Sequence, residues 1–239
     1  MQHRPRDASE TSPNKLLAAL SSADYRRLLP LLDTMPLPFK HILHEPGEVL
    51  RCIYFPGGGV CSITQVMKNQ RMVEVATVGK EGFIGLGALF GGDRVFSGAF
   101  VKVADGAAQV MTVGTFRREM KREGRFSQVI NGYAHAFVGL LTQSVACNAL
   151  HSVEQRCARW LLTTRDRVGR NEFPLTHELL ALMLGVHRPT VTLAASSLQR
   201  ARLIEYERGR VVILDRAGLE AASCECYAVV KRHFARLLR

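Results

Sequence analysis

The sequence lacks several features that would assign it to an obvious class of protein. None of its six cysteines belongs to a Cys-x-x-Cys pair, and no Cys and His residues follow the spacing of a zinc module. No segment offers the roughly 18 consecutive apolar residues that a membrane helix needs. The N-terminal stretch MQHRPRDASETSPNK has no apolar run after its charges, unlike a signal peptide. We therefore expect a reduced, cytoplasmic protein with no membrane partner.

Recognisable sites for catalysis or for a cofactor are also missing. The apolar runs between residues 49 and 113 contain no histidine, so His41 and His44 do not complete the ligand set of a metal-binding barrel enzyme. The glycine-rich stretches PGGGV and GALFGG lack the lysine and the following helix of a phosphate loop. We expect no enzymatic activity, no cofactor and no metal site. The cysteines, including the Cys-x-Cys pair of Cys224 and Cys226, are interpreted as small buried side chains.

What the chain does have is a basic, globular composition. It has 239 residues, 47% of them hydrophobic, which fits one large or two ordinary domains. Its formal net charge of +11 favours an anionic partner. Residues 152–239 carry 15 Lys and Arg against 9 Asp and Glu, and residues 1–151 carry 17 against 12. The C-terminal part is thus the more basic for its length.

The N-terminal part reads as a β domain. Residues 1–14 are polar and are predicted to be a disordered tail. Asn14 and Ser22 are expected to cap two short helices. From Leu37 to about Val113, short apolar runs alternate with Gly-, Pro-, Asn- and Asp-rich stretches, as in an antiparallel jelly roll. MKNQRM and VADGAA are predicted to be hairpin tips. We assign residues 15–125 to this domain.

A long helix is expected next, because 35 residues from Phe126 to Trp160 contain no proline. One stripe of it recurs in steps of three and four: Ile130, Tyr133, Phe137, Leu140, Ser144 and Cys147. The stripe fits a helix that packs on its own barrel, or one that pairs with its copy in a second subunit. We favour the second interpretation, with residues 126–151 as the dimerisation helix of a homodimer.

The stretch LTHELLALMLGVHRPTVTLAASSLQRARL has the pattern of a helix-turn-helix. Such a unit needs a small residue where its helices cross, a glycine in the turn and a branched apolar anchor in the second helix. Ala181, Gly185 and Val191 stand at these three positions. The other inward positions are also apolar: Leu180, Leu184, Val186 and Ala194. The competing interpretation is an ordinary helical hairpin in a core.

An outward face of this unit would suit double-stranded DNA. The residues expected on it are Arg188, Thr190, Thr192, Ser196 and Gln199, with His187 beside phosphate. Arginine can pair with the O6 and N7 edge of guanine, and threonine can use its hydroxyl or its methyl. A β-hairpin around ERGR follows as a wing, whose Arg208 and Arg210 would hold the backbone. We assign residues 152–239 to this winged domain.

With VEQRCARWLL before the helix-turn-helix and a jelly roll before both, the chain resembles bacterial transcription regulators of the Crp/Fnr type. This family is named for the cyclic-AMP receptor protein and the fumarate-nitrate regulator. The resemblance covers about residues 20–215 and implies an α+β fold: an N-terminal antiparallel jelly-roll sensor, a long dimerisation helix and a C-terminal winged helix-turn-helix. It also implies a homodimer on a palindromic operator, an effector of unknown identity and RNA polymerase as a further candidate partner.

The resemblance weakens at the effector pocket. Members that bind cyclic AMP carry a Gly-Glu pair and an Arg-Ser pair in a phosphate cassette, where FIGLGALFGGDRVFSGAF stands here. Leu86 follows Gly85 in place of the glutamate, and Phe96 precedes Ser97 in place of the arginine. Neither side chain can bind a ribose hydroxyl or a buried phosphodiester. We expect a degenerate pocket around these residues and Leu89, and no control by cyclic AMP.

A second hypothesis comes from a different class of protein. The barrel would be a small-molecule-binding or enzymatic domain, and the helical end would serve only for assembly. An assembly module has no use for an exposed Arg188 and a hydroxyl face beside a basic wing, so the first hypothesis is preferred.

Overall fold

Two antiparallel sheets form the N-terminal half of this computed structural model, which describes residues 11–69, 71–103 and 105–237. One sheet has the order β1–β7–β3, with β1 at Asp33–Leu37, β7 at Gly106–Thr112 and β3 at Cys52–Pro56. The other has the order β2–β6–β4–β5, with β2 at Ile42–His44, β6 at Gly98–Val103, β4 at Val60–Val66 and β5 at Met72–Val78. Their shared core holds Ile53, Phe55 and Val101, all fully buried. The predicted jelly roll is confirmed.

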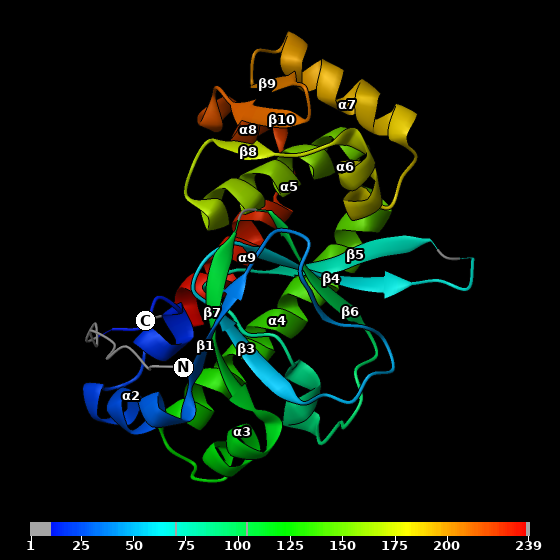
Figure 1. The fold of residues 1–239 in the computed structure, drawn as a ribbon. Helices are drawn as coiled ribbons and strands as arrows, with labels where there is room; N and C mark the ends of the chain where they lie inside the picture. The colour runs from blue at the N-terminus through cyan, green and yellow to red at the C-terminus, as the bar shows by residue number, and fades with distance from the viewer. Residues whose placement is uncertain (1–10, 70, 104, 238–239) are drawn as a thin grey trace.

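Short helices close the ends of this roll (Figure 1). They are α1 (Lys15–Ala18), α2 (Ser22–Leu28), the 3₁₀ turns η1 (Leu29–Leu31) and η2 (Leu86–Phe90), and α3 (Val113–Met120). Asn14 caps α1, as predicted. The cap of α2 is Ser21 rather than Ser22, because the Ser21 hydroxyl accepts the hydrogen bond of the Asp24 amide at 3.0 Å.

The predicted disordered tail is wrong for its last four residues. Asn14 is fully buried, and its amide donates to the carbonyls of Pro56 and Gly82 at 2.9 Å each. Buried hydrogen bonds to two separate loops hold this segment against the roll. The remaining part of the predicted tail, residues 1–10, lies outside the described residues.

One of the two predicted hairpins is present in the structure and the other is not. MKNQRM joins β4 to β5, which pair antiparallel, so this hairpin is confirmed. VADGAA joins β6 to β7, which belong to different sheets, so this prediction is wrong. The chain turns a corner of the roll there, and β7 pairs with β1 and β3 instead. A Gly- and Asp-rich turn between two apolar runs does not distinguish a hairpin from such a corner.

The long helix α4 (Arg125–Leu150) runs past the roll (Figure 1), and its apolar stripe is buried. The predicted dimer face is therefore wrong for Ile130, Tyr133, Phe137 and Leu140, whose exposed fractions within one chain are 7% or less. The Tyr133 ring lies 4.9 Å from that of Phe83 in the roll and 6.1 Å from that of Phe234. Ser144, the fifth predicted contact, is half-buried and donates to the Leu140 carbonyl.

Phe234 comes from α9 (Cys226–Leu237), which lies along α4 (Figure 1). The roll covers one side of α4 and α9 covers another. The rest of the C-terminal half consists of α5 (Val153–Val168), β8 (Glu172–Pro174), α6 (His177–Leu184), α7 (Arg188–Arg200), β9 (Ile204–Glu207), β10 (Arg210–Ile213) and α8 (Arg216–Ala222). Together with the roll these elements confirm the α+β fold class.

A buried polar cluster joins the two halves. Glu74 on β5 accepts hydrogen bonds from Lys102 Nζ at 2.6 Å, from Ser62 Oγ at 2.6 Å and from Trp160 Nε1 at 2.9 Å. Lys102 Nζ also lies 4.3 Å from the centre of the Trp160 ring. Since Trp160 belongs to α5 and the other three residues to the roll, this cluster fixes the C-terminal half on the N-terminal half.

Candidate nucleic-acid interface

Helices α6 and α7 meet at 105°, within the usual range for a helix-turn-helix. Thr176 caps α6, since its hydroxyl accepts from the Leu179 amide at 3.1 Å. Gly185 ends the helix with φ at 66°, the left-handed conformation that favours glycine. Five of the predicted inward side chains are buried, namely Leu180, Ala181, Leu184, Val191 and Ala194, whereas the sixth, Val186, is half-buried. The local prediction of the helix-turn-helix is confirmed.

Helices α6 and α7 also matter for the question whether any helix could cross a membrane. In the ranges that the structure describes, no single helix is long and apolar enough to cross a membrane. Helices α6 and α7 reach that length and composition only when they are taken together across their bend.

The predicted recognition residues lie on α7 with different degrees of exposure. His187, Arg188 and Thr192 are exposed, whereas Thr190 and Ser196 are half-buried. His187 precedes α7 and makes no side-chain capping bond, so its imidazole is available to another partner. Thr192 is held in place, because its hydroxyl contacts the Arg188 carbonyl at 3.2 Å and His177 Nδ1 at 3.1 Å.

His177 supports α7 from the first turn of α6. Its ring lies 4.5 Å from the Tyr206 ring in the wing. Burial, followed by the neighbouring Arg188 cation, lowers the pKa of His177. Both effects favour the neutral form of the imidazole behind Thr192.

Gln199, another predicted base contact, is engaged elsewhere. Its side-chain oxygen accepts the hydrogen bond of the Tyr206 amide at 2.7 Å, which ties the end of α7 to β9. The Tyr206 hydroxyl in turn donates to the Leu175 carbonyl at 2.5 Å. The geometry thus gives Gln199 a positioning role between the recognition helix and the wing.

The wing is a two-residue hairpin. Arg208 and Gly209 both have positive φ, 48° and 76°, as a type I′ turn requires. The hairpin joins β9 to β10, and β8 pairs with the other edge of β10. Arg208 is 90% exposed and Arg210 is 66% exposed, so the two predicted phosphate contacts reach solvent from the turn.

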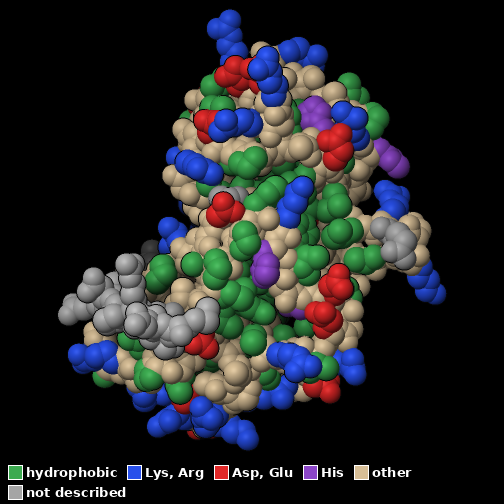
Figure 2. Space-filling model, in the orientation of Figure 1, with side chains coloured by type: hydrophobic (Ala, Val, Ile, Leu, Met, Phe, Trp, Pro, Cys, Tyr) green, Lys and Arg blue, Asp and Glu red, His purple; other side chains and the backbone are tan. Residues whose placement is uncertain are grey.

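Each predicted arginine contact pairs with a neighbouring carboxylate. The pairs are Arg188 with Glu178 at 2.8 Å, Arg208 with Glu207 at 3.3 Å and Arg210 with Glu172 at 2.5 Å. In Figure 2, Lys and Arg side chains lie around the rim of the upper half of the molecule, and acidic side chains lie among them. Exposed pairs of this kind are weak, so phosphate or a base edge can replace the carboxylate.

Two exposed residues of α7 were not among the predicted DNA contacts. Leu193 is 73% exposed beside Thr192, and Pro189 next to Arg188 is exposed as well. Pro189 and Leu193 lie four residues apart, a spacing that places them on one helix face and was a usable signal. The exposed face therefore combines a cation, a hydroxyl and apolar groups.

A cavity of about 310 Å³ opens in the N-terminal half, where the effector pocket was predicted. Four of the five predicted residues line it: Gly85, Leu86, Phe96 and Ser97. Leu89 is half-buried against the core and is not among the lining residues, because η2 turns it away. The other walls are mainly apolar and include Phe83 and Val95 of the roll and Phe137 of α4.

Two features of this cavity concern charge. Phe96, which the resemblance places at the phosphate-binding arginine of the cyclic-AMP-binding members, is 76% exposed. Arg94 also lines the cavity, but its guanidinium donates to the Gly47 carbonyl at 2.8 Å. The cavity thus offers a large apolar surface and one arginine that is already hydrogen-bonded.

Comparison with known proteins identifies the C-terminal unit. Residues 155–222 match the Crp-like helix-turn-helix domain. This match covers α5 through α8, so the chain carries a Crp-like helix-turn-helix domain. A comparison with curated proteins found no significant match.

Solved structures share the fold over about four-fifths of the chain. The c-di-GMP-responsive global regulator CLP of Xanthomonas campestris has a TM-score of 0.68 at 16% identity, covering 81% of this chain and 99% of its own. FixK2 of Bradyrhizobium japonicum has a TM-score of 0.67 at 12% identity, over 81% and 98%. A CRP-family transcriptional regulator of Thermus thermophilus has a TM-score of 0.67 at 20% identity, over 79% and 96%. The fold is that of Crp/Fnr-type transcription regulators.

Proposed function

We propose that the protein is a transcription regulator that binds a specific DNA sequence through α7 and the wing. The observation that carries the proposal is the exposed face of α7 on a Crp-like helix-turn-helix domain. Arg188 reaches solvent at its first turn, where recognition helices contact base edges. An enzymatic role for the barrel has no comparable support, since its cavity is lined mainly by apolar side chains.

The chemistry of the face suggests how it reads the major groove. Arg188 pairs with the O6 and N7 atoms of a guanine after it leaves Glu178, and Thr192 contacts an adjacent base. Leu193 packs against a thymine methyl, a contact that apolar side chains make in the major groove. His187 at the start of α7 and Arg208 and Arg210 in the wing bind phosphate, which fixes the register of the helix in the groove.

We also propose a homodimer, on a face of α4 next to the one predicted from the sequence. The exposed residues of α4 recur in alternating steps of four and three: Asn131, His135, Val138, Thr142, Val145 and Ala149. Val138 is 48% exposed and Val145 is 71% exposed, although both are apolar. A heptad stripe left open by the roll and by α9 suits a paired helix. RNA polymerase stays a proposed partner on the family resemblance alone.

For the sensor, we propose an effector other than cyclic AMP. Leu86 and Phe96 supply neither an acceptor for a ribose hydroxyl nor a charge for a phosphate. The apolar cavity suits a ligand of matching character. In this scheme residues 15–125 are the sensor domain, 126–151 the dimerisation helix and 152–239 the DNA-binding domain.

Selection of bound sequences from a random DNA pool tests the proposal. The expected product is a near-palindrome whose half-sites lie about 34 Å apart, one turn of duplex, because a twofold dimer presents two copies of α7. A pool that keeps its random composition after selection at moderate salt would contradict the proposed function.

A further inference from the structure

Four metal-binding side chains converge where the long helix ends. Cys147 lies in the last turn of α4, His151 directly follows that helix, Cys224 lies between α8 and α9, and Cys226 begins α9. One ligand atom from each side chain can be chosen so that all four lie within 4.8 Å of one another. The three cysteines are buried and His151 is half-buried. None of these four residues belongs to α7 or to the wing, so the cluster is separate from the residues proposed to read DNA.

The spacing of the atoms suits one tetrahedral ion. With Zn–S near 2.3 Å and Zn–N near 2.0 Å, tetrahedral ligand atoms lie about 3.5–3.8 Å apart. Cys147 Sγ lies 3.5 Å from Cys224 Sγ, and Cys226 Sγ lies 3.6 Å from His151 Nδ1. We propose that Cys147, His151, Cys224 and Cys226 bind one thiophilic divalent cation, zinc first among them.

The donor set selects the class of metal. Three thiolates and one imidazole form the Cys₃His set of structural zinc sites, and thiolates disfavour magnesium and calcium. An iron–sulfur cluster with two irons fits less well, because ligands to separate irons lie farther apart than ligands to one ion. All four positions are filled by protein, so the site is structural rather than catalytic.

Neighbouring groups hold the ligands in the orientation that a metal needs. His151 Nε2 lies 3.1 Å from the Glu225 carboxylate, which leaves Nδ1 directed at Cys226. A carboxylate behind a histidine ligand fixes its tautomer and its ring orientation. The Gln143 amide donates to Cys226 Sγ at 3.0 Å and would stabilise a thiolate there.

Positive charge is available to balance the thiolates. Among the described residues, the Nε atoms of Arg156 and Arg159 on α5 are buried without a hydrogen-bond partner. Three thiolates around a divalent ion leave a net negative charge, which these two guanidinium groups are placed to offset.

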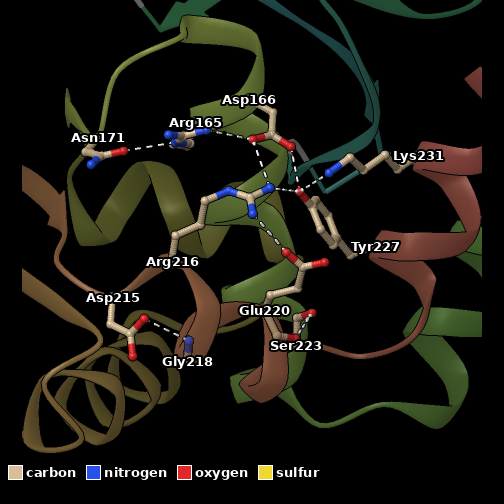
Figure 3. Close-up of polar contacts among 10 residues, drawn as sticks. All are labelled: Arg165, Asp166, Asn171, Asp215, Arg216, Gly218, Glu220, Ser223, Tyr227 and Lys231. Carbon is tan, nitrogen blue, oxygen red and sulfur yellow. Dashed lines mark hydrogen bonds and ion pairs between the residues drawn. The ribbon is translucent and has the colours of Figure 1, made fainter. Parts of the chain in front are cut away.

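A polar network holds the segment that supplies two of the ligands (Figure 3). Arg216 on α8 donates to Glu220 at 3.1 Å and to the Tyr227 hydroxyl at 2.9 Å. The Tyr227 hydroxyl donates to Asp166 of α5 at 2.6 Å. Because Cys224 and Cys226 lie between α8 and Tyr227, their backbone is positioned by contacts that do not depend on a metal. The site is therefore largely preorganised.

The position of the proposed metal site, between two long helices, implies that metal binding affects the stability of the whole chain. Only His151 and Ser152 separate α4 from α5, so the cluster sits at the connection between the long helix and the C-terminal half. An ion there would link that connection to the start of α9. We expect metal binding to stabilise the fold, as structural zinc does in other domains.

The full-length protein, purified under reducing conditions, provides the test. Metal analysis should find one zinc per chain. After removal of the metal, titration with Co²⁺ alone should reach saturation at one ion per chain, with the absorption bands of tetrahedral, thiolate-bound cobalt. Cys224→Ser and Cys226→Ser should lose these bands, whereas Cys52→Ser, outside the cluster, should keep them. His151→Cys should also keep them with altered intensity, since it supplies a fourth thiolate.

The same experiment gives clear contrary outcomes. No cobalt band in the reduced wild-type protein would overturn the proposal, as would equal bands in Cys224→Ser. A Cys147–Cys224 disulfide in the isolated protein, combined with no Co²⁺ binding after reduction, would contradict the metal site. It would indicate a redox-active pair of cysteines instead. If the serine variants fail to fold, the wild-type titration decides alone. Glu225→Gln should weaken Co²⁺ binding by about tenfold, the smallest loss expected when a group that supports a metal ligand is replaced.

Discussion

Arg188 Nε lies 2.8 Å from Glu178 Oε1, so the recognition helix α7 is paired with the helix α6 before any DNA is bound. Both side chains are largely exposed, at 65% and 61%. An exposed pair of this kind is easily exchanged for another partner. The carboxylate holds the guanidinium near the start of α7, and a guanine can take its place.

Replacement of Arg188 should therefore affect one base position. Arg188→Ala is expected to cost about 1–3 kcal/mol at the selected site and to relax the preference at one base pair. Glu178→Gln should raise affinity for all DNA, because it removes a negative charge that competes with the duplex. Glu45→Gln in the sensor half is the matched control. Equal losses for Arg188→Ala on specific and random DNA would contradict base reading.

Replacement of Arg208 should affect all sequences alike. Arg208→Asn removes the charge and keeps a residue that tolerates positive φ, so the wing turn is preserved. Affinity should fall on every sequence, and the slope of log affinity against log salt should decrease by about one per subunit. Arg208→Lys should retain most of the slope. A change in sequence preference would show that the wing reads bases.

Substitutions on the two faces of α4 distinguish residues that hold the proposed dimer together from residues that stabilise the fold of one chain. Val145→Glu should yield folded monomers, because this side chain is 71% exposed in one chain. Phe137→Glu should instead lower the free energy of unfolding by about 3–5 kcal/mol, because a charge would be buried without a partner. Light scattering and calorimetry distinguish these outcomes. A Val145→Glu protein that remains dimeric would exclude this face.

Cyclic AMP and cyclic GMP should not bind at physiological concentrations. Each lost charge-assisted contact at Leu86 and Phe96 removes about 1.5–3 kcal/mol. Two such losses convert a micromolar site into a millimolar one. Isothermal titration calorimetry measures this directly. Micromolar binding of either nucleotide would contradict the prediction and point to Arg94, which would have to leave the Gly47 carbonyl.

The buried Lys102 predicts a pH dependence of stability. Burial lowers its pKa from 10.5 to about 8, although Glu74 opposes the shift. Between these values the unfolded chain binds the proton and the folded chain does not, so the free energy of unfolding rises with pH. This rise should be present in the wild type and absent from Lys102→Met. Denaturant titrations of both proteins between pH 7 and 10 provide the comparison.

Lys102→Met also tests, at pH 7, the buried polar cluster that joins the two halves of the chain. Removal of the cation leaves the Glu74 carboxylate buried beside Trp160, with a cost of about 3–5 kcal/mol. The fluorescence of Trp160, the one tryptophan in the sequence, reports on the same contact. The double variant Glu74→Gln/Lys102→Met should recover part of the loss. No recovery would show that the two residues act independently.

The helix-turn-helix could be predicted from the sequence because its determinants are local. Thr176, Ala181, Gly185 and Val191 lie within one short stretch, and each has a conformational or packing role that its residue type reveals. The strands β3 to β7 could be predicted for the same reason. The edge strand β1 was missed, since its five residues include Asp33 and Pro36 and show no apolar alternation.

Features that depend on distant segments could not be predicted. The stripe of α4 shows that Tyr133 and Phe137 are buried, but not that the roll and Phe234 of α9 bury them. The cysteine cluster is similar, because Cys147 and Cys224 are 77 residues apart and meet only after α8 and α9 have folded. The pairing of Gln199 with the Tyr206 amide likewise requires the position of the wing.

The most direct test of the central claim is a binding titration on two duplexes. One carries the sequence obtained by selection, and the other carries the same bases in scrambled order at the same salt concentration. A sequence-specific regulator should bind the first at least about 10³-fold more tightly, and this ratio should fall for Arg188→Ala. Equal affinities for the two duplexes would contradict the account, because they would leave only the charge of the protein to explain its binding to DNA.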